Sequence, residues 1–340
     1  MALPFFVRDI RYYIAEDFNQ YHDFKSADDR IVARFKNMFI TSSDEKLLNL
    51  YFKENPTQED LDKFLTEWDI EREGGHKALL LAYFMKKHPE FVFPQYVGPR
   101  LQGILKFFKY KNLVIMPHFR KICTAIRDKN VDMLVIKGGS FRHRNPDFPR
   151  VMGDIDFLVR DKDFKTAVDT ALSFGYSYYS FQHSVDICDP KIGFLLDIHR
   201  KLSMQTGSDE LVSEDFFNRA TREKVFSVDG IYVPCPEDMM FILLVNMNKN
   251  LAQLTCRLNI LYYIADSMYL LDLKPDFDWE IVRQNFIKTK TELQAVTSIK
   301  FLNQFVPRKL PEFFVDEFSE KCRLYMSRHP DDENISNGKG

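Results

Sequence analysis

The sequence has few cysteines, and their spacing excludes two common uses of this residue. Five cysteines occur among 340 residues. They lie far apart and no pair has the C-x-x-C spacing. Disulfide-stabilised domains and zinc sites need cysteines paired at short, regular spacings. We therefore expect neither a disulfide framework nor a structural zinc ion.

Long hydrophobic runs and an excess of positive charge are also missing. The longest apolar stretches, residues 78–85 and 239–245, are far shorter than the roughly 18–20 residues that cross a bilayer. The first residues mix charged and apolar side chains without a signal-peptide core, so we expect a cytoplasmic protein that contacts no membrane. The formal net charge is −2. Proteins that grip long nucleic acids usually carry a basic excess, and we expect no extended nucleic-acid binding.

The chain divides by its residue pattern into three structured parts and a polar tail. Residues 1–129 and 236–328 repeat apolar residues at spacings of three and four, which predicts an N-terminal helical region and a C-terminal helical bundle. Residues 130–235 instead contain short apolar runs and alternating stretches, which are typical of strands. Residues 329–340 are polar, and we expect them to be disordered. The sequence thus predicts an α+β protein with a compact core between two helical regions.

Individual strands and helices are expected within this division. Residues 131–137 form a short apolar run that ends at Gly138 and Gly139, as a buried strand would. The Asp229–Gly230 pair predicts the tight turn of a hairpin over residues 226–234. Thr57 is expected to cap a helix whose first turn carries acids. Further strands are expected over residues 154–159, 176–181, 183–188 and 193–199, and separate helices over 99–109, 113–129 and 161–175.

Three aspartates predict a metal site. Asp154 and Asp156 are separated by one residue, so on a strand both carboxylates point to the same face. Like charges this close repel each other unless a cation lies between them. Asp197 lies in an otherwise apolar strand, where an uncompensated carboxylate is costly to bury. Carboxylate ligands select a hard ion such as Mg²⁺, which also binds substrate phosphates.

The residues after the first strand of the core predict a phosphate contact. A strand that ends in Gly138, Gly139 and Ser140 exposes backbone N–H groups. If a helix follows, its N-terminal amides and Ser140 can bind phosphate oxygens. The upstream glycine of the loop G-x-x-x-x-G-K-[ST] is missing, which excludes a kinase-type ATPase.

Several nearby basic residues admit two interpretations each. Lys137 pairs either with phosphate or with an acid such as Asp132 or Asp154. Arg150 either clamps a triphosphate or holds the loop over residues 141–153 by a salt bridge. The cations of that loop form a basic lip for nucleotide or are simply solvated; they are Arg142, His143 and Arg144. His199, on the strand face of Asp197, is either a hydrogen-bonded structural residue or a base that activates an acceptor.

The segment KGGSFRHRNPDFPRVMGDIDFLV, residues 137–159, resembles a bacterial family of uncharacterised nucleotidyltransferases within the DNA polymerase β-like nucleotidyltransferase superfamily. The shared features are a Lys-Gly turn, an Arg-x-x-Gly-Asp-x-Asp strand and a later acid on a strand. Residues 193–202 and 234–250, with Asp266 on a following helix, are also similar to the family's pattern. The resemblance covers residues 130–275, although residues 246–250 (NMNKN) lack a histidine that such proteins often carry there.

The resemblance implies a small mixed β-sheet flanked by helices, two Mg²⁺ or Mn²⁺ ions and a nucleoside triphosphate as substrate. Asp154 and Asp156 would bind both ions, and Asp197 would complete the catalytic metal site. The implied reaction is attack of an acceptor hydroxyl on the α-phosphorus, with pyrophosphate leaving. The residues expected at the nucleotide are Lys137, Gly138, Gly139, Ser140 and Arg150.

Two hypotheses about function follow. The first is an enzyme that transfers a nucleoside monophosphate, with AMP as the expected group, to a hydroxyl of a small molecule, a protein or an RNA end. The alternative is a catalytically idle module that uses the same fold to bind nucleotide or a partner. All three acids are present, which favours the enzyme, because a degenerate protein would more often have lost one.

Overall fold

The computed structural model describes residues 24–72, 75–146, 153–181, 183–189, 191–202, 209–252, 260–306, 310–311 and 313–328. Arg150 and the tail over residues 329–340 lie outside these ranges. The chain divides into two compact units. The first comprises residues 1–69, 243–272 and 291–340, and the second comprises residues 70–242 and 273–290.

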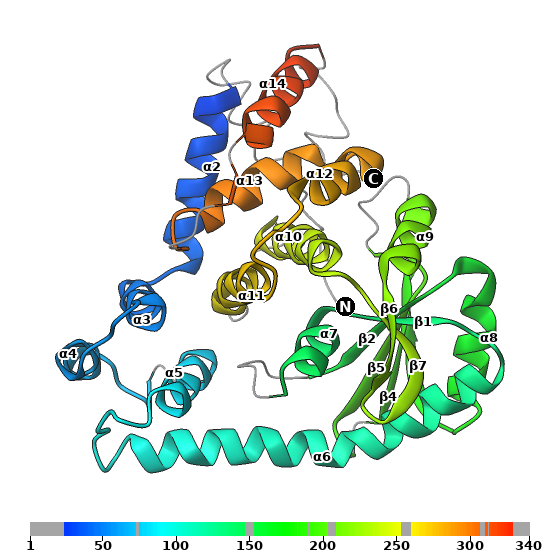
Figure 1. Cartoon of the computed structure of the whole chain (residues 1–340), viewed down its shortest axis with the longest axis horizontal. Helices are drawn as coiled ribbons and strands as arrows, with labels where there is room; N and C mark the ends of the chain where they lie inside the picture. Colours follow the sequence, from blue (N-terminus) through cyan, green and yellow to red (C-terminus); the bar gives the residue numbers. More distant parts are fainter. Residues whose placement is uncertain are drawn as a thin grey trace, which may run out of the picture. The chain divides into compact units, whose positions relative to one another are not determined.

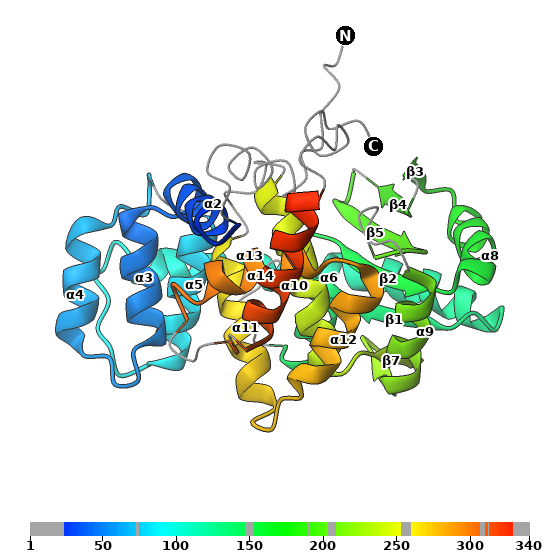
Figure 2. The same ribbon diagram turned by 90° about the horizontal axis from the view of Figure 1, so that it is seen from above.

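A seven-stranded mixed sheet forms the centre of the second unit, which confirms the predicted α+β class (Figure 1). The strand order is β3-β4-β5-β2-β1-β7-β6, and Figure 2 shows the strands from β3 to β7 side by side. The β1–β7 and β2–β5 pairs are parallel, and the other neighbours are antiparallel. The strands are β1 (Met133–Ile136), β2 (Ile155–Val159), β3 (Ser177–Ser180), β4 (Ser184–Asp189), β5 (Phe194–His199), β6 (Thr221–Val225) and β7 (Val228–Val233).

One face of this sheet is buried against helices α6 (Gly98–Asp128) and α8 (Asp161–Leu172). Every second residue of β2 and β5 points into this core, among them Ile155, Phe157 and Ile198. Phe119 of α6 stacks on Phe157 with ring centroids 5.3 Å apart. The opposite face of the same strands is therefore the one that carries their polar residues.

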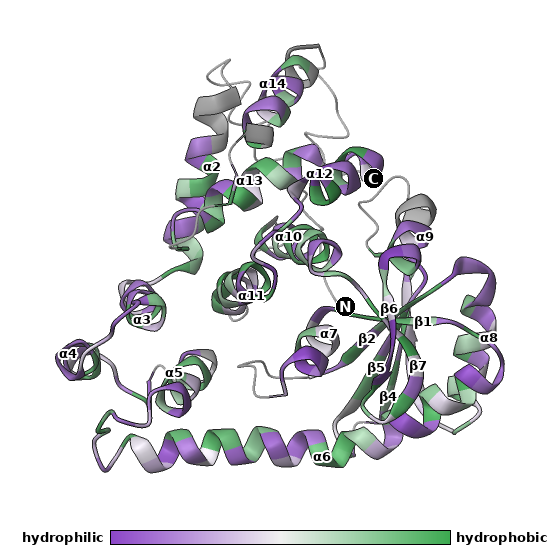
Figure 3. Cartoon of the chain, in the orientation of Figure 1, coloured by the Kyte–Doolittle hydropathy of each residue, from purple (hydrophilic) through white to green (hydrophobic). Residues whose placement is uncertain are grey.

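Helix α6 is continuous where the sequence predicts two helices. Residues 110–112 contain no glycine or proline, so nothing there interrupts the backbone hydrogen bonds. Polar and apolar residues alternate along its length, as Figure 3 shows. The remaining helices of the second unit are α5 (His76–Lys87), α7 (Lys137–Arg144), α9 (Asp209–Arg219) and α12 (Trp279–Thr289).

The predicted hairpin turn at Asp229–Gly230 is wrong. Strands β6 and β7 instead join at Phe226 and Ser227, whose φ angles are 49° and 72°. Positive φ at both central residues matches the right-handed twist of the two strands, as in a two-residue type I′ turn. Gly230 lies inside β7 with a φ of 75°, a left-handed conformation that glycine adopts without steric cost. This glycine thus serves the backbone conformation of the strand and not the turn.

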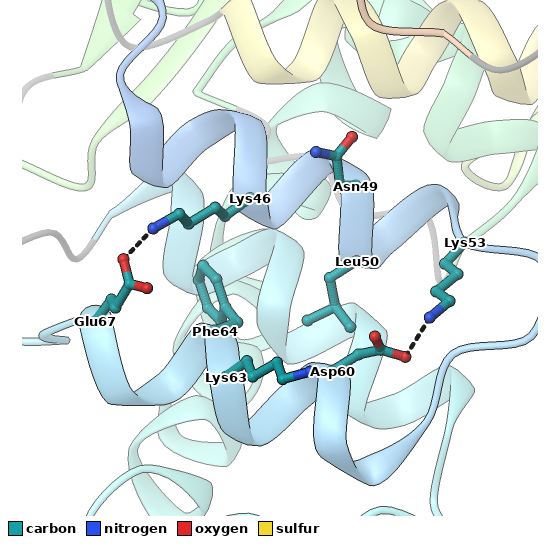
Figure 4. Close-up of a pocket in the computed structure, with 8 residues that line it drawn as sticks. All are labelled: Lys46, Asn49, Leu50, Lys53, Asp60, Lys63, Phe64 and Glu67. Carbon is teal, nitrogen blue, oxygen red and sulfur yellow. Dashed lines mark hydrogen bonds and ion pairs between the residues drawn. The ribbon is translucent and has the colours of Figure 1, made fainter.

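The first unit is helical throughout its described residues. Thr57 caps α4 as predicted, since its hydroxyl accepts from the backbone of Asp60 and its own backbone donates to the Asp60 carboxylate. Figure 4 shows α4 beside α3, with ion pairs between Lys46 and Glu67 and between Lys53 and Asp60. The helices are α2 (Phe24–Phe39), α3 (Ser42–Phe52), α4 (Gln58–Glu67), α11 (Ile260–Leu273), α13 (Glu292–Leu302) and α14 (Phe313–Arg328), while α10 (Pro236–Ala252) runs from the second unit into the first.

No helix within the described ranges is long and apolar enough to span a membrane.

Candidate active site

Three aspartates occupy matching positions on three neighbouring strands. The register pairs Asp156 of β2 with Asp197 of β5, and Asp197 with Asp186 of β4. Residues in register on adjacent strands point to the same face at a separation of about 5 Å. We call Asp156, Asp197 and Asp186 the aspartate row. It lies on the face opposite α6 and α8, because the intervening residues Ile155, Leu196 and Ile187 belong to the core on that side.

Lys137 and His199 contact Asp156, at the end of the row that we call the inner end. Asp186 lies at the outer end. Lys137 Nζ donates to Asp156 Oδ1 at 2.5 Å and lies 3.1 Å from His199 Nε2. His199 Nε2 in turn lies 2.7 Å from Asp197 Oδ2 and 3.1 Å from Asp156 Oδ1. His199 is only 1% exposed. One imidazole thus fixes the orientation of two carboxylates, which fits the structural interpretation of this residue.

The partner of Lys137 differs from both acids that the sequence suggested. Asp132 pairs instead with Arg160 at 2.7 Å and with Arg222 at 3.2 Å. The φ angle of Lys137 is 50°, a conformation that costs a residue with a side chain about 1–3 kcal/mol. It allows α7 to begin directly after β1. The strain is consistent with a position whose side chain is needed at the row.

The pKa values at the inner end follow from burial opposed by neighbouring charge. Burial would lower the pKa of Lys137, but attraction by Asp156 and Asp197 raises it above its ordinary value. Burial would raise the pKa of Asp156, and Lys137 and His199 hold it below its usual range. Burial acts in the same way on Asp197, whose pKa is kept well below its usual range by His199 and Lys137. These groups are therefore charged at neutral pH.

Asp186 at the outer end behaves differently. Burial and repulsion by Asp197 raise the pKa of Asp186 to about 7. Burial beside a charged carboxylate therefore favours the protonated form of Asp186. Sequence reasoning missed Asp186, because an acid that alternates with apolar residues is also typical of an ordinary half-exposed strand.

Asp154 lies directly before β2 and is half-buried. Its charge acts on both Lys137 and Asp186. Within the described residues, however, the group whose potential ligand atoms all lie within 4.8 Å of one another consists of Asp156, Asp197 and His199. The structure thus places Asp154 beside this group and not in it.

The glycine turn forms the first turn of α7, where Gly138, Gly139 and Ser140 are all buried. An added Cβ at Gly139 would lie 2.8 Å from Val135 Cγ2, so glycine lets α7 pack closely on β1. The Ser140 hydroxyl donates to the Lys137 carbonyl at 2.8 Å. The phosphate-binding potential of this segment therefore lies in the free N–H groups that begin any helix.

The basic residues at the other end of α7 have structural contacts. His143 Nε2 lies 2.8 Å from a carboxylate oxygen of Glu223 on β6. Arg144 donates to the carbonyl of Pro234 at 2.7 Å. Both residues tie α7 to the β6–β7 hairpin. They are neither solvated loop residues nor a lip directed at the aspartate row.

The donor set of the row fits a divalent cation. Two carboxylates and one imidazole converge, and Asp197 Oδ1 is buried without a hydrogen-bond partner. A buried acceptor with no donor is costly, and a cation would compensate it. Carboxylate oxygens suit Mg²⁺ and Mn²⁺, which complete their coordination with water and phosphate.

One of three comparisons with known proteins, the match to a family model, agrees with this chemistry. A family model described as uncharacterised nucleotidyltransferase matches residues 75–307, which is more than half of the chain. A comparison with curated proteins finds no match. Among the solved structures that match is the solution structure of the antibiotic-resistance factor ANT(2'')-Ia. That likeness has 12% identity and a TM-score of 0.32, covering 63% of this chain and 96% of the other, so no property is transferred from it.

Proposed function

The chain belongs to the uncharacterised nucleotidyltransferase family, and from this premise we propose that it transfers a nucleoside monophosphate, with AMP the first to test, from a nucleoside triphosphate to an acceptor hydroxyl. In this reaction the hydroxyl oxygen bonds to the α-phosphorus, the bond to the β-phosphate oxygen breaks, and pyrophosphate leaves. The observation that supports the proposal most strongly is the register that sets Asp156 beside Asp197.

The side chains of the row have distinct roles in this proposal. Asp156 and Asp197, with Asp154 beside them, would hold two Mg²⁺ or Mn²⁺ ions. When bound, these ions would neutralise charge on the triphosphate and polarise the α-phosphate. His199 positions the carboxylates of Asp156 and Asp197, because it contacts both. Lys137 supplies positive charge at the inner end, where it can exchange its contact with Asp156 for a phosphate oxygen.

The two substrates would lie at opposite ends of the row. The N–H groups that begin α7 lie beside Lys137 and β1, which favours the inner end as the position of the triphosphate. The acceptor would then lie toward β4 and β3, over Asp186. Tyr179 pairs with Asp186 in the register and is 65% exposed, so its ring is available to an acceptor. A small molecule, a protein and an RNA end all remain acceptors within this proposal.

A binding titration tests the metal site directly. We expect Mg²⁺-dependent or Mn²⁺-dependent binding of a non-hydrolysable triphosphate to fall at least tenfold in the double variant Asp154→Asn, Asp197→Asn. The matched control is Asp169→Asn, an exposed aspartate of α8, and it should bind as the wild type does. Unchanged affinity in the double variant contradicts the proposed site.

A second measurement separates the enzyme from the idle module. Purified protein, labelled ATP and a lysate that supplies acceptors should release pyrophosphate and add one AMP mass to an acceptor. The Asp197→Asn variant should do neither. Metal-dependent triphosphate binding by the wild type without any transfer, for each of the four nucleotides, would favour the alternative of a nucleotide-binding module.

A further inference from the structure

A cavity in the second unit shares no residue with the aspartate row. It has a volume of about 380 Å³ and lies between α6, α7 and the turn that joins β6 to β7. Cavities of roughly 300–1,000 Å³ are the usual size for small-molecule sites. Six of its lining residues carry the inference: Lys109, Asn112, Met116, Arg142, His143 and Phe226.

Asn112 is the residue that points to a ligand. Its side chain lines the cavity, and the residue is only 7% exposed. Neither its amide nitrogen nor its amide oxygen has a hydrogen-bond partner. Leaving such a group buried and unsatisfied costs about 1–3 kcal/mol, and most buried polar groups in proteins are satisfied. A leucine at this helical position would avoid that cost, so the amide is explained by a partner that enters the cavity.

The cavity also has an excess of positive charge. Lys109 and Arg142 both line it, and neither forms an ion pair with any residue in the described part of the chain. His143, the third basic residue, is already held by Glu223 at 2.8 Å. Two uncompensated cations beside one cavity favour an anionic ligand, and a guanidinium suits phosphate because it can donate two parallel hydrogen bonds.

Phe226 gives the cavity a rigid apolar wall. Its φ angle of 49° is unusual for a bulky residue. The ring is held in place by Phe119, at a centroid separation of 5.5 Å, and by His143 at 6.2 Å. Met116 lines the cavity as well. A fixed aromatic ring beside a methionine suits the face of a flat heterocycle.

We propose that this cavity binds a nucleoside monophosphate, independently of the aspartate row. The Asn112 carboxamide would pair with a donor and an acceptor on the edge of the base, as asparagine does with adenine. Phe226 and Met116 contact the face of the base. Lys109 and Arg142 bind the phosphate. The cavity adjoins the C-terminal half of α7, whereas Lys137 begins this helix, so the ligand acts as a second substrate or an effector and not as the triphosphate donor.

Calorimetric titration in EDTA tests the proposal, because EDTA removes metal-dependent binding at the row. The probes are AMP, GMP, CMP and UMP, with adenosine and inorganic phosphate as partial ligands. We expect saturable binding of at least one monophosphate, at least tenfold tighter than adenosine or phosphate. Asn112→Leu should weaken it at least tenfold and leave phosphate binding unchanged. Arg142→Gln should weaken the monophosphate and phosphate alike.

The controls keep the outcome unambiguous. Lys106→Gln removes an exposed cation of α6 outside the cavity and should bind as the wild type does, whereas Lys109→Gln should not. Asn112→Leu should melt at a higher temperature than the wild type, which verifies that it folds. Absence of monophosphate binding by the wild type, equal binding of phosphate alone, or unchanged binding in both Asn112→Leu and Arg142→Gln would overturn the proposal.

Discussion

The two faces of strand β2 contrast in composition and in role. Ile155 and Phe157 point into the core beneath the sheet and are fully buried among apolar side chains. Asp156, between them, points to the opposite face and meets Lys137 and His199. The packed face fixes the strand, and the fixed strand holds a carboxylate that repulsion would otherwise displace. The contrast shows that apolar packing on one face of β2 fixes the position of the strand, whereas the opposite face presents the carboxylate of the candidate site.

The largest effect on stability is expected from a substitution that creates a cavity on the packed face of β2. Phe157→Ala should destabilise the protein by about 3–5 kcal/mol, because it removes a buried ring that stacks on Phe119. Urea unfolding followed by circular dichroism measures this loss. Phe107→Ala, on an exposed part of α6, serves as the control and should cost little. A loss below about 1 kcal/mol at Phe157 would show that this face does not anchor the strand.

A smaller loss of stability is expected on the polar face. Asp156→Asn leaves the Lys137 ammonium without its carboxylate. Breaking a fully buried pair costs about 3–5 kcal/mol, but Lys137 is 20% exposed at its side chain, so we expect about 2 kcal/mol from urea unfolding. The double variant Asp156→Asn, Lys137→Met should recover much of this stability without recovering triphosphate binding. If the changes in the free energy of unfolding of the two single variants simply add in the double variant, the pair of Lys137 and Asp156 does not account for the loss of stability.

The third effect should have the opposite sign. Because the folded-state pKa of Asp186 is raised to about 7, the folded protein binds this proton more tightly than the unfolded chain does. Its contribution to stability is therefore lost as pH rises from about 4, the unfolded value, to about 7. Asp186→Asn should remove this penalty. At pH 8 without metal it should stabilise the protein by about 1 kcal/mol, after discounting for solvent screening.

Urea unfolding at pH 4 and pH 8 checks this prediction for Asp186. The gain should be larger at pH 8, while transfer activity should fall because the residue faces the proposed acceptor. The same change in stability at both pH values would mean that folding does not raise the pKa of Asp186.

Much of the fold followed from local pattern. The alternation of acids and apolar residues correctly predicted strand β2, and an otherwise apolar stretch correctly predicted β5. The Thr57 cap and helix α8 followed from their own residues. The cost of burying Asp197 in an apolar strand predicted only that it needs compensation, and the family resemblance supplied Asp156 as its neighbour. The other predictions depend on neighbours in sequence.

The features that escaped prediction depend on register and on packing between distant segments. Asp186 comes next to Asp197 only because β4 pairs with β5, and the register of this pairing cannot be read from the sequence. The turn at Phe226 and Ser227 contains no asparagine, aspartate or glycine, the residues that favour positive φ. The nearby Asp229–Gly230 pair has the composition of such a turn but does not form it. Asn112 looks like an ordinary helical asparagine in the sequence, because the cavity that it lines forms only by packing of α6 with α7 and the β6–β7 turn.

The parallel pairing of β2 with β5 has a consequence for how this chain can tolerate insertions and deletions. Because side chains alternate along a strand, a deletion in β5 that shifts the preceding residues by one position would put Leu196 and Ile198 in the places of Asp197 and His199 on the polar face. The same change in a surface connection would leave every carboxylate in place. A library of single-codon deletions should therefore show a sharp boundary of tolerance at the ends of β5, even where point substitutions at neighbouring positions are accepted.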